Sequence, residues 1–105
     1  MEEDRIRRLY VDLLIKCISG TIYKDPNMLP GLPAQFEPLA RHTGRDWPVI
    51  AHSMAGTLRL ENVASLVETL LRENIPGDLI ETGVWRGGSC ILMRGVLAGC
   101  GKIEF

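Results

Sequence analysis

Several features that mark particular classes of protein are scarce or missing in this sequence. Its 105 residues contain three cysteines, widely spaced and without a Cys-x-x-Cys pair, so neither a zinc site nor a disulfide framework is indicated. Twelve basic and thirteen acidic side chains give a net charge of −1 with no basic stripe, which argues against a dedicated nucleic-acid-binding protein. No apolar run reaches transmembrane length, because the longest uncharged stretch is only Trp47–Leu58.

Targeting signals are also missing from the sequence. The first eight residues carry six charges, and no apolar region follows a basic start, so a signal peptide is not indicated. We therefore expect a cytoplasmic protein with reduced thiols and with neither a membrane nor a nucleic acid as partner. Hydrophobic residues make up 46% of the chain and charged residues 24%, which is ordinary for a globular domain and excludes a fibrous class.

Apolar residues recur with helical spacing in three segments. The first segment has an apolar stripe formed by Ile6, Leu9, Tyr10, Leu13, Leu14, Cys17 and Ile18. Val11 and Ile15 lie off this stripe, so we expect contacts on two sides of the helix, made either by a partner subunit or by a larger core. A second helix is expected over about residues 58–74, ended by Pro76-Gly77, and a third over about residues 88–97. The residues expected to turn inward on these two helices are Leu60, Val63, Ala64, Val67, Leu70, Leu71, Ile91, Leu92, Val96 and Leu97.

Prolines are concentrated between the first and second expected helices. Five of the six fall within residues 24–48. Proline removes a backbone donor and blocks helix interiors and central strands, so this stretch is predicted to be irregular, with one helical turn near residues 36–41. A loop of this length is either a lid or binding loop or else disordered, and the sequence favours neither interpretation.

A short apolar run and a glycine-rich turn follow the second expected helix. Residues 78–82 are predicted as a strand, and the turn Gly83–Gly88 leads into the third helix. Glycine lets the backbone approach a ligand closely, and the N-terminus of the next helix presents free N–H groups to an anion. This order of helix, strand, glycine-rich turn and helix predicts the opening of a doubly wound α/β fold.

The glycine spacing separates several kinds of nucleotide site. Gly83, Gly87 and Gly88 do not form the Gly-x-Gly-x-x-Gly pattern of dinucleotide sites, so a nucleotide-binding Rossmann domain is a weaker alternative. The Gly-Lys-Ser/Thr of a P-loop is missing, which argues against an NTPase. The order acid-x-Gly-x-x-x-Gly, beginning at Glu81, is typical of S-adenosylmethionine-dependent methyltransferases. The same spacing taken alone also fits an arbitrary strand-to-helix turn.

A longer motif narrows the interpretation. Pro76–Gly88, followed by Met93-Arg94, resembles the signature of the macrocin O-methyltransferase family, which methylates sugar or phenolic hydroxyls of natural products. Two upstream segments, Tyr10–Tyr23 and Trp47–Gly56, resemble that family's N-terminal helix and its cofactor-gating segment. The resemblance implies an α/β fold in which N-terminal helices precede the first strand-loop-helix of a Rossmann-like class I methyltransferase domain, here truncated.

The resemblance also implies a set of site residues. S-adenosylmethionine would be bound by Ser53, Met54, Glu81, Thr82, Gly83, Val84, Trp85 and Ser89, with the acid near its ammonium group. Where Ser53 stands the family more often has threonine, and a hydroxyl is kept. We divide the chain into a helix with a proline-rich gating segment over residues 1–56 and the start of the Rossmann-like domain over residues 57–105.

The groups that perform chemistry in this family are expected elsewhere. The resemblance implies a divalent metal such as magnesium and a proton-accepting base, but both come later in family members, so we assign no catalytic and no metal-binding residue. His52 could act as a general base, but a lone histidine beside apolar residues is more often structural. His42 has no evident partner, and the alternative for Arg86 is a solvated turn residue. Residues 101–105 would hold at most the beginning of a second strand.

Two functions follow from these observations. The first is the N-terminal portion of an O-methyltransferase for a small-molecule hydroxyl substrate, inactive alone. The alternative is a non-catalytic helical interaction module that forms a homo-oligomer through the first helix.

Overall fold

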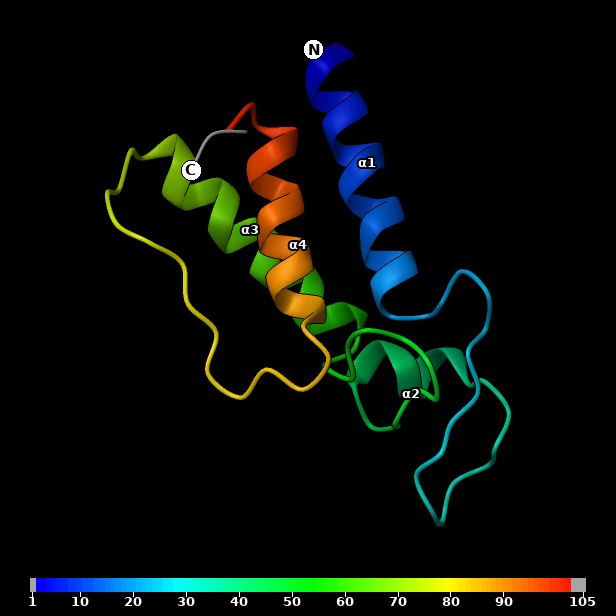
Figure 1. Ribbon diagram of the computed structural model, residues 1–105. Coiled ribbons are helices and arrows are strands. Elements are labelled where there is room, and N and C mark those ends of the chain that lie inside the picture. The colour runs from blue at the N-terminus through cyan, green and yellow to red at the C-terminus, as the bar shows by residue number, and fades with distance from the viewer. Residues whose placement is uncertain (1, 103–105) are drawn as a thin grey trace.

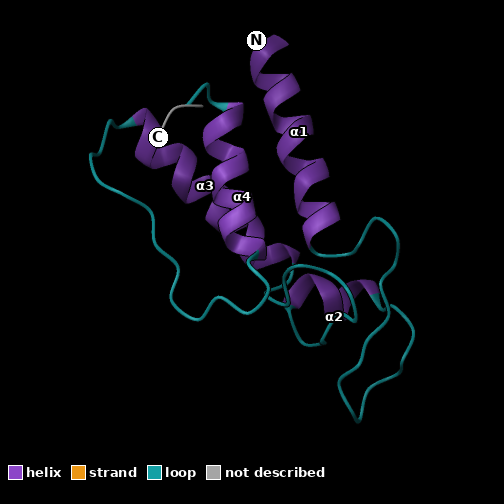
Figure 2. Cartoon of the chain, viewed as in Figure 1, coloured by secondary structure: helices purple, strands orange, loops and turns teal. Residues whose placement is uncertain are grey.

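The computed structural model describes residues 2–102 and arranges them as four α-helices joined by irregular segments (Figures 1 and 2). The helices are α1 (Glu2–Ile18), α2 (Pro38–Thr43), α3 (Thr57–Arg72) and α4 (Gly88–Gly99). Three of them confirm the helices expected from apolar spacing, and α2 is the short helix expected in the proline-rich stretch. No helix in this described range combines the length and the apolar character needed to cross a bilayer.

The core lies where α4 packs against both α1 and α3 (Figure 1). It consists of aliphatic side chains from these three helices: Val11, Ile15, Ile18, Leu60, Ala64, Val67, Leu92 and Val96. Gly95 allows α4 to approach α1 closely, because a Cβ at this position would overlap the side chain of Leu14. The core thus draws on both parts of the chain that we divided at residue 57, and the division itself stays a prediction.

The face that α1 turns to the core differs from the predicted stripe. Ile6, Leu9 and Leu13 are 57%, 55% and 52% exposed, whereas Val11 and Ile15 are buried. Because apolar side chains occupy two faces of this helix, periodicity alone does not decide which face turns inward. Three residues of the apolar stripe, Ile6, Leu9 and Leu13, thus lie outside the core, and we call them the exposed face of α1.

The inward faces of α3 and α4 largely match the prediction. The expected residues are buried or partly buried, except for Ile91, which is 41% exposed. On α4 the buried Gly95 takes the position facing α1.

Residues 78–82 form no strand, so the prediction of this element was wrong (Figure 2). A parallel strand exists through hydrogen bonds to a neighbouring strand, and within residues 2–102 no segment pairs with this one. Ile80 is accordingly 85% exposed. Residues 75–87 instead run as an extended loop that leaves α3 and returns at α4 (Figure 1). The described chain therefore has the loop and the helix of the expected strand-loop-helix unit without its strand. Of residues 101–105, which were expected to hold at most the beginning of a second strand, the first two form no strand and the other three lie outside the description.

A buried arginine organises the stretch between α1 and α3. Arg41 of α2 is 1% exposed and pairs with Asp46 at 2.9 Å. It also donates to the main-chain carbonyls of Ser19 at 3.0 Å and Asp25 at 2.7 Å, and the ring of Phe36 lies 5.2 Å from its guanidinium carbon. A buried charge is tolerated when it is paired and hydrogen-bonded in this way. These contacts favour an ordered lid or loop over a disordered proline-rich segment.

Candidate functional site

The glycine-rich loop, residues 81–88, takes its shape from three left-handed residues. Gly83 and Gly87 have φ angles of +79° and +82°, and Trp85 has a φ of +53°. This conformation suits glycine but costs roughly 1–2 kcal/mol for a bulky side chain, so Trp85 is strained. A hydrogen bond from the Gly87 N–H to the Val84 carbonyl, 3.1 Å long, closes the turn just before α4.

The beginning of α4 lies directly against residues 52 and 53. A Cβ on Gly88 would lie 2.5 Å from the Cβ of Ser53 and 2.7 Å from the carbonyl oxygen of His52. The Gly88 N–H donates to that carbonyl at 3.0 Å. Glycine is therefore required here for a close approach to residues 52–53, rather than to the strand expected before the turn. One N–H group of this helix N-terminus is consequently bound within the chain.

Arg86 forms a second connection between the loop and the segment before α3. Its Nη1 atom donates to the carbonyl oxygens of Val49 at 2.9 Å and of Ala51 at 3.0 Å. Its guanidinium carbon lies 4.1 Å from the centre of the Trp85 ring, within the range of a cation–π contact. Arg86 is thus the exposed turn residue of the alternative, but its guanidinium group is bound within the chain rather than by solvent alone. No spacing in the sequence could have identified the partners, because they are 37 and 35 residues away.

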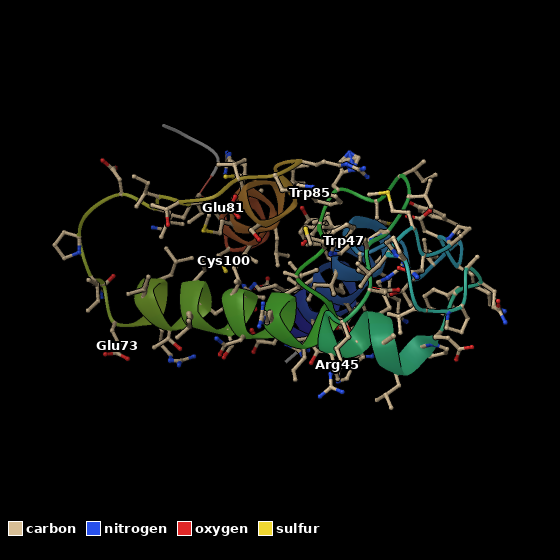
Figure 3. All side chains as sticks on the ribbon, turned by 90° about the horizontal axis from the view of Figure 1, so that it is seen from below. Arg45, Trp47, Glu73, Glu81, Trp85 and Cys100 are labelled. Carbon is tan, nitrogen blue, oxygen red and sulfur yellow. The ribbon has the colours of Figure 1, made fainter. Side chains whose placement is uncertain are left out.

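The structure brings part of the predicted cofactor site together. Ser53 is 5% exposed, lies against the start of α4, and accepts a hydrogen bond from the Ala55 N–H at 3.1 Å. Met54 and Ser89 are half-buried. The other five residues, Glu81–Trp85, lie on the loop, and all of them except the half-buried acid are exposed. Figure 3 shows Glu81 and Trp85 on this loop. The role of all eight residues in cofactor binding stays a prediction.

The carboxylate of Glu81 accepts a hydrogen bond from a weak donor. The Sγ atom of Cys90, on α4, donates to its Oε1 atom at 3.1 Å. This bond, more than the slight burial and the nearby negative charge, raises the pKa of the Cys90 thiol. The thiol therefore stays protonated and unreactive at neutral pH. The carboxylate remains accessible to a stronger, cationic donor.

The two histidines have different environments. The side chain of His52 is exposed, and the group with which it contacts the loop is its main-chain carbonyl. His42 is hydrogen-bonded through Nδ1 to Oγ1 of Thr57 at 2.5 Å, a partner that the sequence did not reveal. Across residues 2–102, no group of three or more His, Cys, Asp or Glu side chains is arranged to hold a metal ion.

Comparisons with known proteins extend these observations. The family model described as macrocin-O-methyltransferase (TylF) matches residues 23–104. Demethyldecarbamoylnovobiocin O-methyltransferase of Streptomyces niveus is 51% identical over 92 residues, which cover 85% of this chain and 35% of that protein. Mycinamicin III 3''-O-methyltransferase of Micromonospora griseorubida is 50% identical over 91 residues, which cover 85% of this chain and 36% of that protein. The match to the solved structure of the O-methyltransferase NovP covers 93% of this chain and 38% of the NovP chain, with a TM-score of 0.85 and 48% sequence identity.

These matches show that the helices and the loop resemble parts of known O-methyltransferases. The chain belongs to the macrocin O-methyltransferase family, which confirms the resemblance found in its motif. It spans 35–38% of the length of the relatives named above.

Proposed function

We propose that this chain forms the cofactor-binding start of a cytoplasmic, S-adenosylmethionine-dependent O-methyltransferase for a sugar or phenolic hydroxyl of a natural product. The observation that carries the proposal is the junction between the loop 81–88 and residues 49–53, in a chain of this family. The names of the relatives include demethyldecarbamoylnovobiocin and mycinamicin III, which favours a small-molecule acceptor.

The residues present fit the charged end of the proposed cofactor. The described partner of the Glu81 carboxylate is a thiol, and an ammonium group would replace it with a charge-assisted hydrogen bond. At Gly83, no described residue other than Gly83 and its two chain neighbours has an atom within 4 Å of where a Cβ would stand, which leaves room for a ligand against the backbone. The proposed cofactor-binding residues are Ser53, Met54, Glu81, Thr82, Gly83, Val84, Trp85 and Ser89.

The chemistry divides between the cofactor and the protein. When bound, S-adenosylmethionine supplies an electrophilic methyl group on a sulfonium centre. In our proposal Glu81 orients the ammonium end, while Ser53 and Met54 cover the cofactor from the other side and exclude water. The residues described here hold no cluster that fits the magnesium ion expected in the family, so we derive no step through a metal.

We also propose that residues 78–82 become the first strand of a Rossmann-like sheet when neighbouring strands pair with them. Leu79 and Ile80 are 37% and 85% exposed, as expected for a strand that lacks its neighbours. A cavity of about 770 Å³ with a largely apolar lining lies between α3, α4 and residues 75–79. This cavity offers room for packing against such a sheet.

A hybrid enzyme tests the proposed function. It joins this chain to the rest of the Streptomyces niveus relative, in place of that protein's matching 92-residue region. We expect the hybrid to methylate demethyldecarbamoylnovobiocin with a radiolabelled methyl donor, and the isolated chain to give no product. A folded hybrid that neither binds S-adenosylhomocysteine nor forms product would contradict the proposal. Methyl transfer by the isolated chain would contradict its dependence on the rest of the enzyme.

A pair of variants tests the role of Glu81 within the hybrid. Glu81→Gln keeps the shape of the side chain but removes its charge, so calorimetry should show affinity for S-adenosylhomocysteine reduced about tenfold. Glu73→Gln is the matched control, because Glu73 lies in solvent at the end of α3 (Figure 3). Equal affinities of the two variants would refute an ion pair between Glu81 and the ligand.

The exposed face of α1 favours a second function. Ile6, Leu9 and Leu13 are more than half exposed and follow one another at helical spacing, so they form an apolar stripe. We propose as the alternative a non-catalytic module that pairs with a second copy through this stripe. Sedimentation at rising concentration should then show a dimer, and Leu9→Lys a monomer. A wild-type chain that stays monomeric at high concentration argues against this function.

A further inference from the structure

Residues 49–53, which we call the strap, are anchored through their N–H groups on one side. The N–H groups of Ile50 and Ala51 donate to Oδ2 of the buried Asp25, at 2.9 Å and 2.8 Å. The N–H groups of the next two residues donate to the carbonyl oxygen of Ile18, at 3.1 Å and 3.2 Å. These four hydrogen bonds attach the strap to α1 and to the turn that follows α1.

The carbonyl groups of the strap are bound by the glycine-rich loop. Nη1 of Arg86 bonds the carbonyl oxygens of Val49 and Ala51, and the Gly88 N–H bonds that of His52. Every one of these donors belongs to the loop or to the first residue of α4. The strap is therefore held between two structures, and Arg86 is the side chain through which the loop reaches it.

The loop fixes the guanidinium group as well as the strap. Trp85 has a left-handed backbone, and its ring lies 4.1 Å from the guanidinium carbon of Arg86. Arg86 is itself exposed, so its contacts add little to the buried core. An exposed cation that is stacked on one side and bonded to two carbonyls is better suited to setting the position of a backbone than to stabilising the fold.

We propose that Arg86 is a positioning residue that holds the strap in register with the loop 81–88, so that Ser53 and Met54 face the cofactor site. The identity of the cofactor rests on the function proposed above, whereas the contact between Arg86 and the strap does not. Arg86 acts through the main chain of the strap.

Two substitutions separate this role from simple packing of the side chain. Both hydrogen bonds to the strap start from one nitrogen, so a lysine ammonium with three donors can make both. Arg86→Lys therefore keeps the connection in part, whereas Arg86→Met keeps the apolar stem and loses both bonds. If only the stem matters, the two variants behave alike.

Hydrogen exchange measured by mass spectrometry on the 105-residue chain tests the contact. We expect the amides of residues 50–56 to exchange about tenfold faster in Arg86→Met, because two hydrogen bonds to a cation are lost, and to recover in part in Arg86→Lys. Arg59→Met, on the exposed side of α3, is the matched control and should exchange like the wild type. Unchanged exchange of residues 50–56 in Arg86→Met overturns the proposal. Equal acceleration in the methionine and lysine variants, or acceleration that extends over α1 and α3, overturns it too.

The hybrid enzyme separates this inference from the proposed function. In the hybrid, Arg86→Met should weaken binding of S-adenosylhomocysteine about tenfold, and Arg86→Lys should restore part of it. Wild-type affinity in Arg86→Met overturns the positioning role. Failure of the unsubstituted hybrid to bind the ligand overturns the proposed cofactor instead, and the exchange experiment then decides the role of Arg86 in holding the strap.

Discussion

Arg41→Met removes the buried cation that joins α2 to the turn after α1. Arg41 is 1% exposed and its partner Asp46 is 2% exposed. Methionine keeps most of the apolar stem but leaves the carboxylate without a counterion and the carbonyls of Ser19 and Asp25 without their donor. An unpaired member of a buried ion pair costs about 3–5 kcal/mol. Because a chain of this size is stable by about 5–15 kcal/mol, the variant should lose a large share of its stability.

Urea denaturation followed by circular dichroism measures this loss of unfolding free energy. The matched control is Arg5→Met, because Arg5 and Glu2 pair at 3.3 Å with side chains 69% and 73% exposed, and the loss there should stay below about 1 kcal/mol. The double variant Arg41→Met/Asp46→Met should be more stable than Arg41→Met alone, because it no longer leaves a charge buried without a partner. A loss below about 1 kcal/mol in Arg41→Met, or additive losses in the double variant, would refute the reasoning.

Three further predictions concern the loop and the core. Gly88→Ala puts a Cβ 2.5 Å from a side-chain carbon and 2.7 Å from a main-chain oxygen, so thermal melting should report a loss of about 1–3 kcal/mol. Glu81→Gln removes the carboxylate whose hydrogen bond raises the pKa of the Cys90 thiol. Because a raised pKa means that less thiolate is present at a given pH, this variant should be alkylated by iodoacetamide faster than the wild type at one alkaline pH. Ile15→Ala opens a cavity in the core and should cost about 2–5 kcal/mol in urea titrations, whereas Leu13→Ala on the exposed face of α1 should stay within about 0.5 kcal/mol.

Each of these three predictions has an internal control. Gly87→Ala meets only backbone strain, because no described residue beyond its chain neighbours lies within 4 Å of its Cβ position. It should therefore lose less unfolding free energy than Gly88→Ala. Alkylation of the exposed Cys17, followed by mass spectrometry, should not change in Glu81→Gln. Equal losses of unfolding free energy in Ile15→Ala and Leu13→Ala would show that the faces of α1 are wrongly assigned.

The sequence predicted the long helices well because their signal is local. Apolar spacing and the glycines and prolines at the ends fall within one segment, and α3 and α4 lie close to their expected bounds. The inward face of α1 could not be predicted in the same way, because both Val11 and Leu13 are apolar and only the packing of α1 against α3 and α4 selects between them. The strand at residues 78–82 needs a neighbour that is not among residues 2–102, so its apolar pattern alone did not produce it.

The sequence predicted which segments form the candidate site, but not the hydrogen bonds that join them. The motif named the loop and the gating segment as candidates because their residues follow a recognisable order, and their role in binding stays a prediction. The links between them are hydrogen bonds from Arg86 and Gly88 to main-chain carbonyls, and a main-chain acceptor leaves no trace in the identity of the residue that carries it. The same reason explains why the carbonyl of His52, rather than its imidazole ring, proved to be the group in contact with the loop.

The last carbonyl group of α1 connects the position of this helix to that of the candidate site. The oxygen of Ile18 accepts the N–H groups of His52 and Ser53 at 3.1 Å and 3.2 Å, so the strap moves with the end of the helix. The helix backbone has a radius of about 2.3 Å, and a rotation of roughly 30° about the axis therefore displaces a terminal atom by about 1 Å. A molecule that binds the exposed face of α1 and rotates the helix about its axis would shift Ser53 by a similar distance without contacting Ser53. Movement of the exposed face of α1 would in this way change the geometry of the candidate site.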